Sequence, residues 1–126
     1  MATKTKSKSD IGRSSKRKGK IGELEVVNLL KAAGYNTHRS VQYCGATGDA
    51  PDVVVEGLPL HIEVKRVERL NLKQAYQQAV HDSKANGNNE IPVVFHRRSR
   101  QPWMVMLSAD DFLTLIKKGE RETNNE

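Results

Sequence analysis

Two acidic residues and a lysine are spaced so that a β-hairpin would gather them on one face. Asp52 comes directly before the apolar run 53–55, and Glu63 and Lys65 lie two positions apart within the run 60–67. If residues 56–59 form a four-residue loop, Asp52 lies opposite Glu63, with Cβ atoms roughly 4.5–5.5 Å apart. Side chains alternate along strands, so Lys65 shares their face and an aliphatic face lies on the other side.

Close carboxylates repel each other, and a hard divalent cation relieves that repulsion. Mg²⁺ is commonly held by one or two carboxylates and keeps several waters, which leaves room for a phosphate oxygen. Lys65 would then stand where an ammonium group can stabilise developing charge or help to deprotonate a water. An exposed strand face with a cross-strand ion pair would show the same residues. The hairpin alone leaves both interpretations open.

A third carboxylate, Glu23, falls at the edge of a predicted helix stripe. Glu23 precedes Val26, Val27 and Leu30 by three, four and seven residues, so it borders the face that should be buried. A carboxylate in that position needs a partner, such as a cation site, Lys65 or a backbone N–H group. It could equally act as a capping charge in the first turn of the helix.

The elements that must position these residues are predicted from hydrophobic periodicity and from helix and turn signals. A helix begins near Ile21 and ends at Gly34, the segment 35–41 is extended, and 44–51 is a loop. Strands 53–55 and 60–67 follow, then a helix over 72–85, strands 92–97 and 103–107, and a helix over 109–117. Asn71 and Ser108 are expected to cap the last two helices. The order αβββαββα predicts an α/β protein with a central mixed β-sheet flanked by helices.

Composition and charge restrict the class of protein. The 126 residues suit one domain, expected over 19–118, and no run reaches the roughly 20 apolar residues of a membrane span. Cys44 is the single cysteine, which excludes an internal disulfide. With no secretory leader in view, a cytoplasmic location is expected.

The positive charge is concentrated at the N-terminus. The first twenty residues hold eight lysines and arginines and one acid, Asp10, a formal charge of +7 in a chain whose total is +6. We expect residues 1–18 to be a disordered basic arm and 119–126 a frayed polar tail. Such an arm fits a phosphate backbone, although a solvated leader or a nuclear-import signal would look similar.

The chain resembles a known family in the segments KGKIGELE (18–25), Ala33-Gly34-Tyr35, Arg39, Pro51-Asp52 and IEVK (62–65). They are similar to the archaeal Holliday junction resolvase family of the PD-(D/E)xK nuclease superfamily, and still more to the small phage-borne nucleases of that group. The likeness runs from about Lys18 to Gln78. Glu23 stands eleven residues before Gly34, and Gln78 stands thirteen after Lys65, as in the family. The serine–glycine of the archaeal enzymes is replaced here by Tyr43-Cys44-Gly45.

The resemblance implies a restriction-endonuclease-like core and a catalytic set of Glu23, Asp52, Glu63, Lys65 and Gln78. It implies that Asp52, Glu63 and the carbonyl of Val64 hold Mg²⁺ or Mn²⁺, with Glu23 bound through water or to a second ion. Lys65 would activate the attacking water and Gln78 would orient Lys65 or the phosphate. The products would carry a 5′-phosphate and a 3′-hydroxyl.

Further side chains are candidates for DNA contact or for assembly. The expected phosphate or DNA contacts are Lys18, Lys20, Arg39, Gln42, Tyr43, Arg97, Arg98 and Arg100. His61 shares the face of Glu63 and could touch phosphate or simply lie at the surface. Apolar residues of the last helix could seal the core or form a homodimer contact, which the two symmetric cuts of a junction would favour.

The sequence therefore predicts a metal-dependent DNA endonuclease acting on branched or otherwise structured DNA. Two alternatives remain at this stage. One is a nicking or sequence-specific phage endonuclease, and the other is a non-catalytic DNA-binding accessory protein.

Overall fold

The computed structural model describes the backbone of residues 8–40 and 50–124, and the side chains of 19–40 and 50–122. Its elements are α1 (Lys8–Ala32), β1 (Thr37–Arg39), β2 (Val53–Val55), β3 (Leu60–Arg66), α2 (Leu72–Asn86), β4 (Ile91–Arg97), β5 (Met104–Met106) and α3 (Ala109–Asn124). This order confirms the predicted αβββαββα arrangement. None of the described helices has the length and apolar composition of a membrane-spanning segment.

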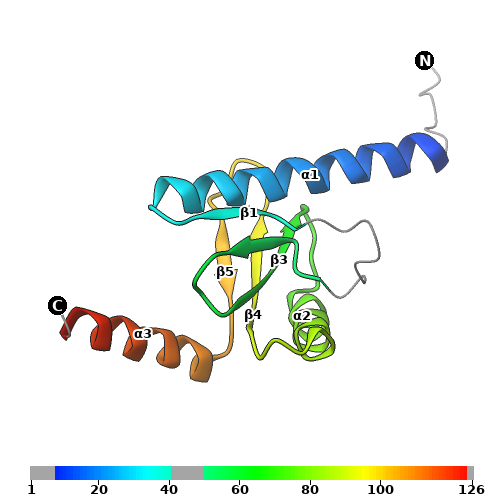
Figure 1. Cartoon of the computed structure of the whole chain (residues 1–126). Coiled ribbons are helices and arrows are strands. Elements are labelled where there is room, and N and C mark those ends of the chain that lie inside the picture. The colour runs from blue at the N-terminus through cyan, green and yellow to red at the C-terminus, as the bar shows by residue number, and fades with distance from the viewer. Residues whose placement is uncertain (1–7, 41–49, 125–126) are drawn as a thin grey trace, which may run out of the picture.

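The five strands form one mixed sheet in the order β1-β2-β3-β4-β5. β3 and β4 are parallel and are connected through α2, whereas the other neighbouring pairs are antiparallel. A parallel pair needs a crossover connection, and the helix supplies it. In Figure 1, α1 runs across the sheet and α2 lies on the other side of β3 and β4. The prediction of a mixed sheet flanked by helices is confirmed.

The main core lies between α1 and one face of the sheet. Ile62 of β3 and Val93 and Phe95 of β4 pack there against Val26 and Val27 of α1. Strand residues two apart share a face, so the same face includes Val53 and Val55 of β2 and, half-buried, Leu60 and Val64 of β3. The predicted aliphatic face of the β2–β3 hairpin is thus the face of the sheet against which α1 packs.

A smaller cluster on the opposite face holds α2. Ala75 and Ala79 pack on Val94, whose side chain points away from those of Val93 and Phe95. The Asn71 side chain accepts a hydrogen bond of 3.1 Å from the N–H of Gln74, which confirms the predicted N-cap. Because small alanines meet the sheet, the helix lies close to the residues of β3 that share this face.

The β2–β3 hairpin has the predicted register. Val53 pairs with Ile62, and the Asp52 N–H donates to the Ile62 carbonyl at 2.8 Å. On the other side, the Asp52 carbonyl accepts from the N–H of Ser40, 3.0 Å away. The backbone of Asp52 is therefore fixed between β1 and β3, and its side chain lies near that of Glu63.

Two glycines determine how α1 ends and how closely it approaches the sheet. Gly34 has φ of 99°, and the N–H groups of Gly34 and Tyr35 donate to the carbonyls of Lys31 and Leu30, the Schellman pattern of a helix end. At Gly22 a Cβ atom would lie 3.0 Å from Cβ of Arg66, closer than such atoms normally pack. A bare glycine at that position allows α1 to lie directly on β3.

Two helices are longer than expected. α1 begins at Lys8 rather than near Ile21, so residues 8–18, expected to be disordered, are helical, whereas 1–7 lie outside the described residues. The segment contains no proline and is rich in lysine and arginine, so a helix nucleated over the packed part can extend into it. α3 likewise continues through Gly119 to Asn124, because one glycine weakens a helix by only about 1 kcal/mol.

Glu25 joins α1 to β3, to β4 and to Trp103 just before β5, although its helix position predicted a place further toward solvent. Its carboxylate accepts from Arg97 Nη1 at 2.7 Å and from the Trp103 indole at 3.1 Å. Arg66 Nε lies 3.3 Å from its other oxygen. These half-buried contacts of Glu25 fix α1 over the sheet two residues after Glu23.

Replacing Glu25 by alanine should lower the free energy of unfolding by about 1–3 kcal/mol, because it removes the acceptor of Arg97 Nη1 and of the Trp103 indole and the charge partner of Arg66. Denaturant unfolding followed by circular dichroism measures the change. Glu56→Ala is the matched control, since Glu56 forms only an exposed 3.7 Å pair with His38. Equal stabilities of the two variants would show that Glu25 does not fix α1.

Candidate active site

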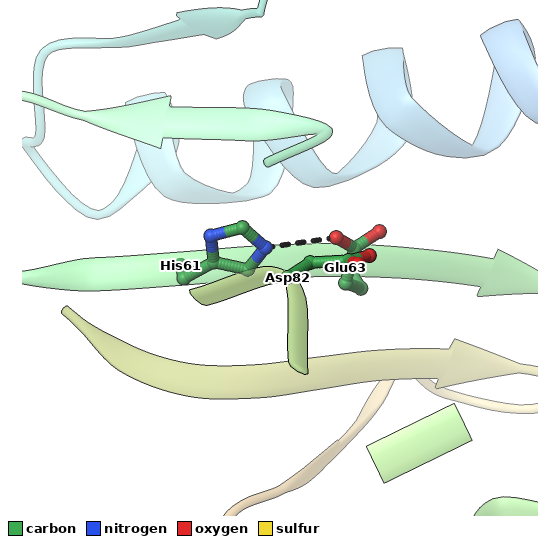
Figure 2. Close-up of side chains that lie close together, drawn as sticks. All are labelled: His61, Glu63 and Asp82. Carbon is green, nitrogen blue, oxygen red and sulfur yellow. Dashed lines mark hydrogen bonds and ion pairs between the residues drawn. The ribbon is translucent and has the colours of Figure 1, made fainter. Parts of the chain in front are cut away.

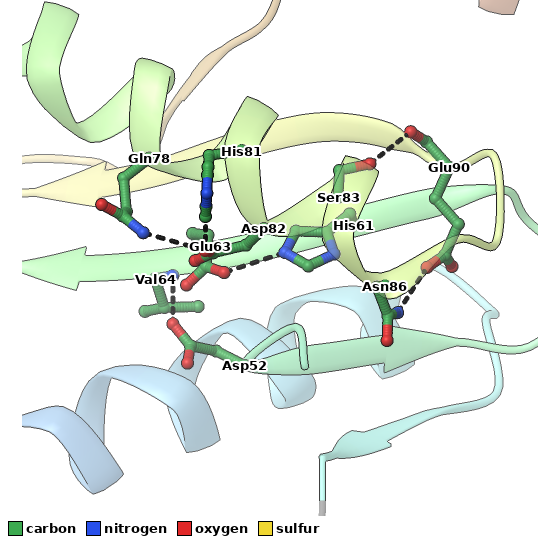
Figure 3. A network of polar contacts seen from close by, with 10 residues as sticks. All are labelled: Asp52, His61, Glu63, Val64, Gln78, His81, Asp82, Ser83, Asn86 and Glu90. Carbon is green, nitrogen blue, oxygen red and sulfur yellow. Dashed lines mark hydrogen bonds and ion pairs between the residues drawn. The ribbon is translucent and has the colours of Figure 1, made fainter. Parts of the chain in front are cut away.

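The carboxyl groups of Asp52 and Glu63 meet at the edge of β3. Asp52 Oδ2 accepts a hydrogen bond of 2.8 Å from the N–H of Val64, and the Glu63 carboxyl group lies close enough to raise the pKa of Asp52. Figure 3 shows Asp52 between α1 and β3, with Glu63 on the side of α2. The N–H and carbonyl of a strand residue point to the same edge, so the Val64 carbonyl points toward Asp52 as well. The predicted juxtaposition of Asp52 and Glu63 is present.

This arrangement perturbs Asp52 strongly. Burial, followed by the charge of Glu63, raises the pKa of Asp52 from 3.8 to about 7, against the opposing effect of the Val64 N–H. Glu23 adds a smaller repulsion, so it lies within electrostatic range of Asp52. Two acids, Glu63 and Glu23, thus act on Asp52, and no cation is among the causes of its pKa shift.

Glu23 projects from α1, on the other face of the sheet from Glu63. Its carboxylate pairs with Arg39 at 2.8 Å, and both side chains are partly exposed. The described residues hold one group of at least three potential ligands within 4.8 Å of one another, and it consists of His61, Glu63 and Asp82. Glu23 therefore lies near Asp52 and Glu63, but the three carboxylates do not form a group within 4.8 Å of one another. Arg39, which was predicted to contact phosphate, contacts Glu23 instead.

Lys65 and Gln78 line the same small hollow beside α2. This hollow has a volume of about 230 Å³ and is also lined by Gln74 and Asn71. Lys65 follows Glu63 on the same face of β3, as predicted from alternation. The Gln78 amide donates to Asp82 Oδ1 at 2.8 Å, so in this structure Gln78 orients Asp82.

Two residues beside Glu63 were not part of the predicted site. His61 is fully buried and its Nε2 lies 2.9 Å from Glu63 Oε1, so it is neither at the surface nor placed to contact phosphate. Asp82, on α2, is 6% exposed and stands close to both (Figure 2). Alternation along β3 placed His61 on the face of Glu63 but did not show that α2 would bury it, and the four-residue helical spacing from Gln78 could have indicated Asp82.

The predicted DNA contacts fall into three groups. Arg97 is occupied, since its guanidinium binds Glu25 at 2.7 Å and the Gln101 carbonyl at 2.7 Å. Arg98 and Arg100 are exposed in the turn that follows β4, next to the end of β3, and Lys20 is exposed on α1. Gln42, Tyr43 and the side chain of Lys18 lie outside the part of the chain that the structure describes.

The donor set around Asp52 suits a hard divalent cation. It consists of carboxylate oxygens and a strand carbonyl that points toward them, the ligands that Mg²⁺ and Mn²⁺ prefer. Burial, followed by the charge of Glu63, raises the pKa of Asp52, and a bound cation would offset both effects. The residues present therefore fit such an ion.

The raised pKa of Asp52 predicts a pH-dependent stability for the metal-free protein. The folded state binds the Asp52 proton more tightly than the unfolded state, so stability from this group is full below pH 3.8 and is lost as the pH rises to about 7. Asp52→Asn should remove this loss. The stability of the variant relative to the natural chain should rise between pH 4 and 7, by on the order of 2–4 kcal/mol, and then level off.

Urea unfolding at a series of pH values, in the presence of a chelator, measures the difference. Glu56→Gln is the control, because it changes one carboxylate at an exposed position remote from the site. A difference between Asp52→Asn and the natural chain that stays constant with pH would show that Asp52 is not perturbed.

Comparisons with known proteins show the fold and the family of the chain. The solved structure of Hjc, a Holliday junction resolvase from the archaeal hyperthermophile Archaeoglobus fulgidus, matches with a TM-score of 0.53 and 25% sequence identity. The match covers 71% of this chain and 72% of that chain, which confirms the resolvase-like fold. No curated protein matches the chain significantly. Residues 14–125 match the model of the family described as "Phage putative PDDEXK endonuclease", so the chain belongs to this family of phage PD-(D/E)xK endonucleases.

Proposed function

We propose that the protein is a divalent-metal-dependent DNA endonuclease that hydrolyses phosphodiester bonds in branched DNA. The observation that carries the proposal is the pair Asp52 and Glu63, two neighbouring carboxyl groups of which one is held by a backbone N–H of β3. A protein that only binds DNA gains nothing from acids that repel phosphate. Hydrolysis of a phosphodiester, in contrast, needs a place for a cation beside the scissile bond.

Asp52, Glu63 and the Val64 carbonyl would hold the ion, Mg²⁺ or Mn²⁺, with Glu23 acting through water or toward a second one. The bound ion would supply Lewis-acid polarisation of the phosphate and a water of lowered pKa. Side chains of the protein would orient the phosphate and transfer the proton. Glu23 is held by Arg39, so its carboxylate has a defined orientation at the edge of the site.

Lys65 is the proposed general base or charge-stabilising group. It follows Glu63 by two residues on one face, and it lines the open hollow in which a water and a phosphate oxygen could lie. Gln78 lines the same hollow, and its bond to Asp82 fixes its position there. We assign Gln78 to orienting Lys65 or the phosphate.

The DNA backbone is proposed to lie across the end of the sheet at which β3 and β4 terminate. Lys65 and Arg66 of β3 pair with His96 and Arg97 of β4, so the turn carrying Arg98 and Arg100 follows directly beside the hollow. Lys20 and the helical basic segment before Gly19 would add contacts from α1, and Arg39 would add one from the end of β1. With DNA as the proposed substrate, the cytoplasm of a bacterial or phage-infected cell is the proposed location.

Branched DNA is favoured over a specific sequence by two observations. The solved structure that matches this fold is that of a Holliday junction resolvase. The described residues, 8–40 and 50–124, form the one sheet and its helices and include no separate base-reading module. A nicking or sequence-specific endonuclease and a non-catalytic binding protein are the alternatives that experiment must separate.

Asp52→Asn and Lys65→Met should each reduce DNA cleavage at least about 100-fold while leaving DNA binding intact, because they remove a cation ligand and the proton-transferring group. Labelled four-way junction, flap, nicked and linear duplex DNA are incubated with Mg²⁺, Mn²⁺ or EDTA, and the products are resolved on denaturing gels. The junction should be cut fastest, and EDTA should abolish cutting.

Glu56→Gln provides the control and should cut at the natural rate, since Glu56 lies at the far end of the β2–β3 hairpin. Binding without cutting under every metal would contradict the proposal and favour the accessory protein. Fastest cutting at one duplex sequence would keep the nuclease and overturn the preference for branches.

We also propose a homodimer formed through α3 and β5. The apolar side chains Phe112, Leu113 and Ile116 of α3 are exposed, as are Met104 and Val105 of the neighbouring edge strand β5. Figure 1 shows α3 extending away from the sheet. A second copy is the occupant that fits, because an edge strand can pair with its own symmetry mate and a four-way junction offers two equivalent cleavage sites.

Replacing both Phe112 and Ile116 by glutamate should convert a dimer into a monomer of 14.1 kDa, because charges cannot be buried in an apolar interface. Light scattering coupled to size exclusion measures the mass. Thr114→Glu, which changes an exposed polar residue of the same helix, should leave the dimer intact. A natural chain that is monomeric, or a double variant that remains dimeric, would contradict the proposed interface.

A further inference from the structure

His61 is a buried histidine that the proposed chemistry does not use. It lies on β3 two residues before Glu63, on the face that α2 covers, and its side chain is 0% exposed. A buried imidazole needs hydrogen-bond partners. Its one partner among the described residues is Glu63, through a 2.9 Å contact between Nε2 and Oε1.

The surroundings of the ring decide which nitrogen carries the proton. Nδ1 is buried without a partner in the described part of the chain. A proton on Nδ1 would leave that donor unsatisfied and would direct the Nε2 lone pair at a carboxylate oxygen. With the proton on Nε2, the imidazole donates to Glu63 Oε1, and only a weak acceptor is left unpaired. The geometry therefore favours the Nε2–H tautomer.

Because of this hydrogen bond, one oxygen of Glu63 is held by His61 and the other is left to bind a cation. Oε1 is held by His61, and Figure 3 shows the other oxygen directed toward the side of β3 on which Asp52 lies. Asp82 closes the opposite side, since its carboxylate lies within 4.8 Å of the groups of His61 and Glu63. Gln78 holds Asp82 there at 2.8 Å. A turn of Glu63 toward α2 would bring two buried carboxylates together.

We propose that His61 is a positioning residue that fixes the orientation of Glu63 for binding a divalent cation, with Asp82 preventing the alternative orientation. The inference rests on the proposed role of Glu63 as a metal ligand. Hydrogen bonds to metal-ligating side chains orient the ligand and raise its basicity, and their loss typically weakens metal binding about 10–100-fold. Affinity for the ion, rather than folding, is then the property that His61 controls.

Two amide substitutions test whether Glu63 needs a hydrogen-bond donor at the position of Nε2 or only a polar side chain at residue 61. In His61→Gln the amide nitrogen can take the place of Nε2 and donate to Glu63, whereas in His61→Asn it takes the place of Nδ1 and cannot reach. Calorimetric titration of the metal-free full chain with Mn²⁺ should give about 10–100-fold weaker binding for His61→Asn and binding within about threefold of natural for His61→Gln. Thermal unfolding without metal, followed by circular dichroism, is the check on folding.

The outcomes distinguish this inference from the function on which it rests. If the natural chain binds no Mn²⁺, or if Glu63→Gln binds it unchanged, the proposed metal site fails. If Glu63→Gln loses binding but both His61 variants bind like the natural chain, only the positioning role is overturned. Equal losses in both His61 variants would also overturn it, because the ring itself would then be required.

A second measurement needs no folded variant at position 61. Long-range ¹H–¹⁵N NMR spectra of the natural protein report the tautomer of each histidine ring, and a buried ring is recognised by its slow exchange with solvent. The Nε2–H form is expected for His61, both without metal and with Mg²⁺. The Nδ1–H form would overturn the proposal.

Discussion

Two carboxyl groups that repel each other are held side by side at the edge of β3, and the rest of the molecule is arranged around that unfavourable contact. The Asp52 backbone is hydrogen-bonded to Ile62 on one side and to Ser40 on the other, and its side chain is held by the Val64 N–H. Asp52 cannot move away from Glu63 without breaking these bonds. Burial and the charge of Glu63 raise the pKa of Asp52 to about 7. A bound cation would offset the repulsion between the two carboxylates.

The same strand supplies both the core and the chemistry because its side chains alternate. Ile62 and its neighbours of the same face bury aliphatic surface under α1. His61, Glu63 and Lys65 face α2, where the packing residues are alanines and leave room for polar groups. The stability of the sheet and the placement of the acids thus depend on one register, and a slip by one residue would exchange the two faces.

Local rules explain what could be predicted from the sequence. The faces of the β2–β3 hairpin follow from a period of two, the end of α1 from Gly34, and the caps from Asn71 and Ser108, which accepts from the Asp111 N–H at 3.1 Å. The resemblance to a nuclease family, carried by a few spaced residues, predicted the family that the comparison then showed.

What escaped prediction depends on contacts between elements distant in the chain. The partners of Glu25 lie 72 and 78 residues away, so no helical pattern could show that it faces Arg97 and Trp103. Asp82 reaches Glu63 only because α2 crosses back over β3. The length of α1 was missed for a different reason: its basic segment has the composition of a disordered arm but continues a helix that packing has already nucleated.

The absence of a side chain at position 22 has a consequence for the precision of the site. Arg66 Cβ and Val64 Cγ1 stand 3.0 and 3.4 Å from where a Cβ of residue 22 would be, so α1 rests on β3 with bare backbone at this point. Glu23 is the next residue along the helix, and Val64 carries the N–H that holds Asp52. Direct van der Waals contact between the α1 backbone and β3 therefore sets the distance of Glu23 from Asp52 and Glu63. No flexible side chain lies between the helix and the strand at this point to make that distance variable.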